Sequence, residues 1–221
     1  MKLDLLSTIK GSALEDFFPA GWDLERMDEL AGRPPERIGE REEYWSEGYE
    51  PVECESVEDL EIRMGVEIAT QVIEARAEGR QLALILPVGP MGMYRWAIDR
   101  LKKEKVSCDH VWGFNMDEWS DAEGNTLPGD TPGSFQNAME EAFYDRLGEL
   151  TVPPEQRYFA TRERLEQYPG KIAELRAEGA KLVVVYGIGR ALHIAFWEPT
   201  FAAEYENVAE WKKASHRIGA R

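Results

Sequence analysis

The sequence predicts an α/β fold: a three-layer α/β/α, Rossmann-like arrangement around a mostly parallel sheet. Three short runs, at residues 82–89, 110–116 and 181–189, are apolar almost throughout, as strands buried on both faces of a parallel sheet are. Helical patterns separate these runs, in the order strand, helix, strand, helix, helix, strand. That alternation is typical of a parallel sheet covered by helices on both faces.

The domain organisation follows from where these patterns begin. The chain has 221 residues, which corresponds to one domain, or to one domain with an appendage. Residues 1–55 are charged, aromatic and without a clear period, so we expect an irregular N-terminal segment packed on the core. Residues 56–221 are expected to form the α/β domain.

The first expected helix covers residues 56–79. Ser56 is a suitable N-cap, acidic residues follow it, and Gly79 is a typical helix stop. Apolar residues recur every three or four positions and predict one buried face, formed by Leu60, Met64, Ile68, Val72 and Ala75.

Three further helices are expected between and after the first two strands. They cover residues 91–104, residues 134–147 with Ser134 at the start, and residues 165–179 with Gly179 at the end. The segment 120–133 is rich in Pro and Gly and is expected to be a loop.

Composition excludes several classes of partner. The formal net charge is −16, which argues against nucleic acid and against a simple anionic-membrane binder. No window approaches the roughly 18 apolar residues of a membrane span, and the first residues lack the pattern of a secretory signal. Cys54 and Cys108 have no CxxC spacing and are expected to be small buried or half-buried apolar residues. We therefore expect a cytoplasmic protein.

The chemistry is expected where the strands end, because open parallel sheets bind ligands beyond the carboxyl ends of their strands. The three runs end in "PVGPMG", "NMDEWS" and "YGIGRALHIAFWEP". The second supplies adjacent acids, Asp117 and Glu118, of which one could instead cap a helix or pair with an arginine. The third supplies His193 and Glu198 after Gly187 and Gly189, although a lone histidine is often a core residue.

These segments resemble a known family. "LPVGPMGMYRWAIDRL", "VWGFNMDEW", "DTPGSF" and "YGIGRALHIAFWEP", in this order and spacing, are similar to glucosamine-6-phosphate deaminase (isomerase). The resemblance covers roughly residues 57–200 and extends to a superfamily that includes 6-phosphogluconolactonase. It implies a fold of the sugar-phosphate isomerase/CoA-transferase type and a small-molecule sugar phosphate as substrate.

The resemblance also implies roles for individual residues. Asp117 matches the general base that moves a proton between C1 and C2 of the open-chain sugar, and Glu118 follows it in the motif. His193 matches the histidine that assists ring opening, and Glu198 the carboxylate that supports it. The expected substrate-binding residues lie in the two glycine-containing loops: Val88, Gly89, Met91, Gly92, Gly187, Gly189 and Arg190. This chemistry requires no metal and no cofactor.

The sequence departs from the family pattern at three places. The family has G-I-G-x-D-G-H where this chain has Ala191 and Leu192, so the aspartate that would orient His193 is missing. The phosphate loop is two residues shorter, lacks hydroxyl side chains and contains Pro90, which removes a backbone donor. Relatives continue well past Pro199, so we expect a fragment that is incomplete at its C-terminal end, a chain whose sheet is completed by a partner, or a shortened homologue.

Three hypotheses follow. The chain is an aldose–ketose isomerase or deaminase of an (amino)sugar 6-phosphate, a sugar-phosphate-binding homologue without turnover, or a 6-phosphogluconolactonase-type hydrolase. An unpaired sheet edge would favour assembly, so we expect a homo-oligomer.

Overall fold

The computed structural model describes residues 46–121 and 123–188, with a few isolated positions outside these ranges (residues 11, 25, 28–29, 40–41, 205–207 and 209–210). Most of the N-terminal segment predicted at residues 1–55 lies outside the described residues. The predicted division at residue 55 therefore stays a prediction.

The described core is built on a four-stranded sheet in the order β3-β2-β1-β4. The strands are β1 (Leu82–Leu86), β2 (Val111–Asn115), β3 (Arg157–Tyr158) and β4 (Lys181–Val184). Every pairing is parallel, with Leu82 opposite Val111 on one side and Lys181 on the other. The predicted parallel α/β sheet is confirmed.

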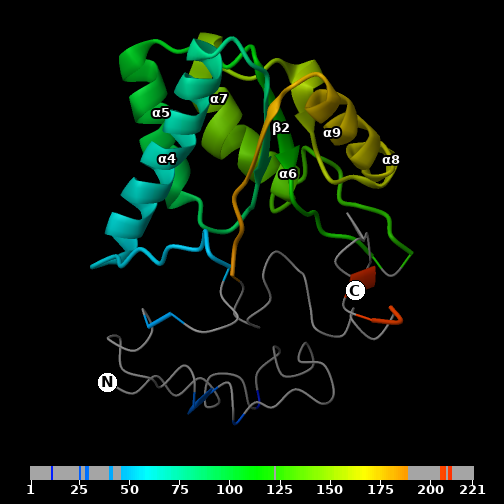
Figure 1. Ribbon diagram of the computed structural model, residues 1–221. Helices are drawn as coiled ribbons and strands as arrows, with labels where there is room; N and C mark the ends of the chain where they lie inside the picture. The colour runs from blue at the N-terminus through cyan, green and yellow to red at the C-terminus, as the bar shows by residue number, and fades with distance from the viewer. Residues whose placement is uncertain are drawn as a thin grey trace.

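Helices lie on both faces of the sheet. α4 (Val57–Ala77) and α5 (Gly92–Glu104) lie side by side on one face, and α7 (Asp145–Leu147) lies with them (Figure 1). α8 (Arg162–Leu165) and α9 (Tyr168–Ala177) lie on the opposite side of β2. The remaining short helices are α6 (Phe135–Met139), η2 (Glu140–Tyr144), η3 (Gly148–Leu150) and η4 (Pro154–Gln156).

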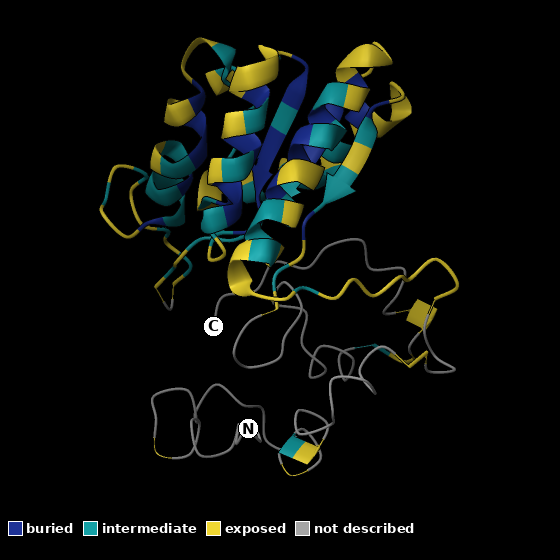
Figure 2. Cartoon of the chain, turned by 90° about the vertical axis from the view of Figure 1, so that its left-hand side faces the viewer, coloured by how far each residue is buried: buried dark blue, intermediate teal, exposed yellow. Residues whose placement is uncertain are grey.

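Alternation along the strands produces two apolar cores. Leu82, Leu84 and Leu86 belong to the larger core, between the sheet and α4, α5 and the segment 139–147. Ala83 and Phe114 belong to the smaller core, which packs on Leu175 of α9. Figure 2 shows that the buried residues gather in the strands and on the sheet-facing sides of the helices. The three-layer arrangement is therefore confirmed.

α4 begins as the sequence predicts, because the Ser56 side chain accepts a hydrogen bond from the Asp59 backbone N–H. Ile68, Val72 and Ala75 are buried, in agreement with the predicted apolar face. Leu60 was expected on this face but is 46% exposed, because the first turn of α4 extends beyond the sheet.

Other elements differ from the sequence prediction in detail. The helix expected at residues 134–147 changes to a π-helical turn over Glu140–Tyr144 before it ends as α7. β3 was not predicted, since two residues leave no recognisable period. β4 was expected to be a buried strand but is only partly buried, and Leu182 is 36% exposed. Within the described residues β4 pairs only with β1, which explains its exposure.

Both cysteines are free thiols, as expected, with Cys108 buried and Cys54 partly buried. Burial raises the pKa of the Cys108 thiol to about 12, so it remains protonated. Among the described residues no helix has the length and apolarity to cross a membrane.

Gly65 sets the distance between α4 and α5. A methyl group at this position would overlap the Met93 carbonyl oxygen and lie 2.9 Å from the Ala97 backbone nitrogen. Both atoms belong to the backbone of α5, so relief requires the helices to separate. We expect Gly65→Ala to lower the free energy of unfolding by about 2 kcal/mol, measured by urea denaturation.

Gly170 in α9 provides the matched control, because nothing lies within 4 Å of a methyl group placed there. Gly170→Ala should be neutral or stabilising by up to about 1 kcal/mol. Equal stability changes in the two variants would contradict the assignment of Gly65 to a close helix contact.

Candidate active site at the carboxyl edge of the sheet

The carboxyl ends of β1, β2 and β4 meet at one edge of the sheet. Leu86 at the end of β1 pairs with Asn115 at the end of β2, and the Met116 backbone N–H donates to the Leu86 carbonyl at 3.0 Å. On the other side, the Val185 N–H donates to the Ile85 carbonyl at 3.0 Å. The loops that follow these strands therefore begin next to one another, as the parallel topology requires.

Asp117 lies two residues beyond β2 and is partly buried. Its Oδ1 atom is inaccessible to solvent and has no hydrogen-bond partner within the described residues. The pKa of Asp117 is raised to about 7, mainly by burial and also by the negative charge of Glu118, while a backbone hydrogen bond from Val88 opposes both effects. This carboxylate can accept and release a proton near neutral pH, as a general base requires.

Glu118 has a different environment from its neighbour. Its Oε1 atom accepts the Phe135 N–H at 2.8 Å and the Trp119 N–H at 2.9 Å, while Oε2 accepts the Gln136 N–H at 2.8 Å. Phe135 and Gln136 are the first residues of α6, so Glu118 caps this helix and holds it at the carboxyl edge. These contacts show a positioning carboxylate, and the catalytic role expected for Glu118 stays a prediction.

The Ser134 side chain completes the start of α6. It is fully buried and accepts the Asn137 N–H at 3.0 Å, as expected for the residue predicted to begin this helix. Glu118 and Ser134 together provide acceptors for the first three N–H groups of α6, which fixes the loop that carries Asp117.

Asn115 lies at the candidate site, although the sequence analysis did not single it out. It is 1% exposed, its Nδ2 donates weakly to the Phe135 carbonyl at 3.4 Å, and its Oδ1 has no partner within the described residues. Asn115 stands two positions before Asp117, a spacing that places two side chains on the same side of an extended chain. That spacing in "FNMDE" was the available signal.

The turn between β1 and α5 carries four predicted substrate-binding residues: Val88, Gly89, Met91 and Gly92. Gly89 has φ +143°, a conformation that favours glycine, and its carbonyl accepts the Met91 N–H at 2.8 Å. The Tyr94 hydroxyl donates to the Pro87 carbonyl at 2.6 Å and anchors the turn on α5. Val88 also reaches Asp117 through its backbone, so this turn and the candidate base belong to one site.

The other wall of the predicted site is only partly described. Gly187 follows β4, and a Cβ atom placed on it would lie 3.7 Å from Cβ of Pro87, so the two loops adjoin. Gly189, Arg190, His193 and Glu198 lie outside the described residues. Their place beside Asp117 stays a prediction.

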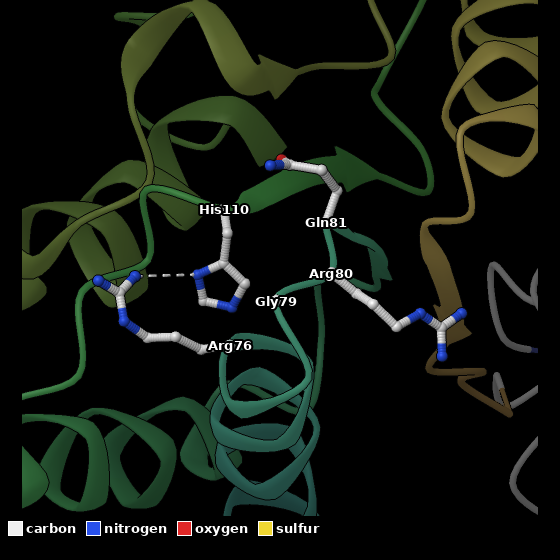
Figure 3. A pocket seen from close by; sticks show the side chains of 5 residues that line it. All are labelled: Arg76, Gly79, Arg80, Gln81 and His110. Carbon is white, nitrogen blue, oxygen red and sulfur yellow. Dashed lines mark hydrogen bonds between the residues drawn. The ribbon is translucent and has the colours of Figure 1, made fainter.

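A hollow of about 300 Å³ lies at the opposite edge of the sheet, where Gln81 and His110 precede β1 and β2 (Figure 3). Its two arginines have protein partners: Arg76 binds Asp109, and Arg80 donates to the Gly179 carbonyl. The His110 Nε2–H donates to the Val72 carbonyl at 2.9 Å. This hollow is remote from Asp117 and shares no residue with the candidate site.

The candidate site contains carboxylates but no recognisable metal centre in its described part. Within residues 46–121 and 123–188, as at the isolated described positions, no three His, Cys, Asp or Glu side chains are grouped to hold a metal ion.

Comparison with a solved structure identifies the fold of the described core. The chain matches that of a monomeric glucosamine-6-phosphate deaminase, described as a missing link of the NagB superfamily, with a TM-score of 0.53 and 25% identity. The match covers 67% of this chain and 58% of the other. The described core therefore has the α/β fold of that superfamily.

Curated proteins with similar sequences indicate which kind of enzyme this chain resembles. Glucosamine-6-phosphate deaminases from Caenorhabditis elegans, Borrelia garinii and Proteus mirabilis are 32%, 34% and 30% identical over 60%, 52% and 57% of this chain. The matches span 48%, 41% and 46% of those proteins, so the chain covers less than half of their length. No protein-family model matches the chain. The resemblance to glucosamine-6-phosphate deaminases indicated by the motifs is confirmed.

Proposed function

We propose that this chain contributes the catalytic edge of an isomerase or deaminase that acts on an amino-sugar 6-phosphate. The observation that carries the proposal is the carboxylate of Asp117, which lies half-buried at the carboxyl edge with a pKa of about 7 and whose Oδ1 atom has no hydrogen-bond partner within the described residues. The similarity to glucosamine-6-phosphate deaminases supports this substrate class.

In the proposed reaction Asp117 takes the proton from C2 of the open-chain sugar and returns it to C1. At the same time O1 gains a proton and the ammonium group on C2 loses one, so C1=O becomes C1–OH while a C=N double bond forms at C2. Water then adds to this iminium carbon, its protons pass to the nitrogen, and ammonium leaves as C2 becomes the ketone carbon. Proton abstraction beside a carbonyl or iminium requires a positioned base of suitable pKa, and a partly desolvated aspartate meets that requirement.

The remaining substrate contacts belong to the same proposal. Val88, Gly89, Met91 and Gly92 would face the phosphate end, where backbone N–H groups at the start of α5 favour an anion. Gly187, Gly189 and Arg190 would form the second wall. His193 and Glu198 would assist ring opening, and Ala191 leaves His193 without the aspartate of the family pattern.

A binding homologue without turnover is the second candidate, and Ala191 together with the short phosphate loop favours it. The lactonase-type hydrolase has less support, since the named relatives are deaminases. The expected homo-oligomer remains a proposal, and the matched solved structure is of a monomeric deaminase.

Ammonia release from glucosamine 6-phosphate tests the proposal. The base must be ionised, so activity should rise with pH through about 7, with roughly tenfold more activity at pH 8 than at pH 6. The measurement is a coupled ammonia assay across this range with the full 221-residue chain. Ligand binding without ammonia at any pH would support the binding homologue instead.

A further inference from the structure

The start of α5 already has a carboxylate beside it. Gly92 is the first residue of this helix, and the carboxylate of Glu61 lies directly against its α carbon. A Cβ atom at position 92 would overlap the carboxyl carbon and both oxygens of Glu61. The absence of a side chain on Gly92 therefore makes room for an acid from α4.

Helix packing explains how Glu61 reaches this point. α4 and α5 both run against the direction of the strands, so both begin at the carboxyl edge of the sheet (Figure 1). Gly65 contacts the first two turns of α5, and Glu61 lies one turn earlier in α4. The close approach at Gly65 thus brings Glu61 level with the start of α5.

The electrostatics of this helix end favour the arrangement. The first turn of α5 contains no acidic residue, and the Met91 side chain makes no capping hydrogen bond within the described part of the chain. A carboxylate beside the positive end of a helix dipole is stabilising. Glu61 supplies that charge from the neighbouring helix.

The same helix end is where the phosphate of the substrate is placed in the proposed function, on which this inference rests. We propose that Glu61 determines the charge preference of the site: its carboxylate occupies the anion-binding end of α5 and weakens the binding of a phosphate group there. Two anions beside one helix end repel each other, and a partly buried pair is screened less than an exposed one.

Calorimetric titration of the full chain with inorganic phosphate, at low ionic strength and pH 7.5, tests this directly. Glu61→Gln keeps the side-chain volume and removes the charge, so phosphate should bind about tenfold more tightly than to the unmodified chain. Glucose, which carries neither a phosphate nor any other charged group, should bind equally to both.

Glu67→Gln is the matched control, since it removes the same charge from an exposed position further along α4. It should leave phosphate affinity unchanged. Equal phosphate affinity in the unmodified chain and both variants, or absence of phosphate binding in all three, would overturn the inference. Unchanged circular dichroism and thermal midpoint would show that the Glu61 variant is folded.

The role of Glu61 and the proposed reaction can fail independently, because phosphate affinity tests the first and ammonia release tests the second. If Glu61→Gln tightens phosphate binding but neither the unmodified chain nor any variant releases ammonia, the role of Glu61 is supported and the deaminase reaction is not. If ammonia is released and the phosphate affinity of the Glu61 variant is unchanged, the reaction stands and the role of Glu61 does not.

Discussion

Replacement of Asp117 by asparagine is expected to lower ammonia release from glucosamine 6-phosphate by at least about a hundredfold at pH 8. Asparagine keeps the shape of the side chain but cannot take the C2 proton, and a positioned base contributes roughly 10² to 10⁴ in rate. Binding of inorganic phosphate should change by less than about threefold, because Asp117 is proposed to contact the C2 proton and not the phosphate group. Steady-state kinetics and calorimetric titration measure the two effects separately.

The same substitution should stabilise the folded protein. Asp117 has a raised pKa, so the folded state favours the neutral acid and bears a cost when the buried carboxyl ionises. That cost is absent below about pH 4, grows as pH rises to about 7, and is complete above it. Asp117→Asn should therefore raise the free energy of unfolding by about 2 kcal/mol at pH 8 and by almost nothing at pH 4.

Asp99→Asn provides the control for both effects, since Asp99 is exposed on α5. It should leave activity and stability within experimental error. If Asp117→Asn lost activity only in proportion to a loss of folded protein, Asp117 would be a structural acid and the proposed mechanism would be wrong.

Truncation of Glu118 is expected to have the second-largest effect. Glu118→Ala removes the acceptor from three backbone N–H groups, at Trp119, Phe135 and Gln136. Hydrogen bonds to a charged acceptor are among the stronger ones, so the free energy of unfolding should fall by about 3 kcal/mol. Urea denaturation at pH 7 measures this loss.

Glu118→Gln separates the capping role from the charge. Glutamine retains one acceptor oxygen, so the stability loss should be about half that of the alanine variant. The charge of Glu118 raises the pKa of Asp117, so its removal should move the midpoint of the activity profile below pH 7. Glu123→Gln, on the exposed loop that follows, should move neither quantity. An unchanged midpoint in Glu118→Gln would contradict the coupling of the two acids.

The sequence was sufficient to predict the parts of the fold that depend on local patterns. Ser56, the apolar face through Ile68 and Val72, and the start of α6 at Ser134 all follow from neighbouring residues. The exposure of Leu60 does not, because periodicity identifies a helix face but not where the sheet beneath it ends. The exposure of β4 also depends on pairing, which an apolar run does not reveal.

In the candidate site, too, local features could be predicted from the sequence, whereas features that depend on packing could not. The sequence placed Asp117 and Glu118 at a strand end but could not assign their separate roles, since these depend on where α6 begins in space. The unpaired oxygen of Asn115 and the approach of Glu61 to Gly92 likewise arise from packing between distant segments. His193 and Glu198 lie outside the described residues, so the expectation for them rests on the motif alone.

The most direct test of the central claim is to follow glucosamine 6-phosphate by proton NMR in deuterated buffer with the full chain. If Asp117 transfers the C2 proton to C1, some of that proton should exchange with solvent, and fructose 6-phosphate should form with deuterium at C1. The Asp117→Asn variant should form neither labelled product nor labelled substrate. Bound substrate that retains its C2 proton and yields no product with the unmodified chain would contradict the assignment of this site to isomerisation or deamination.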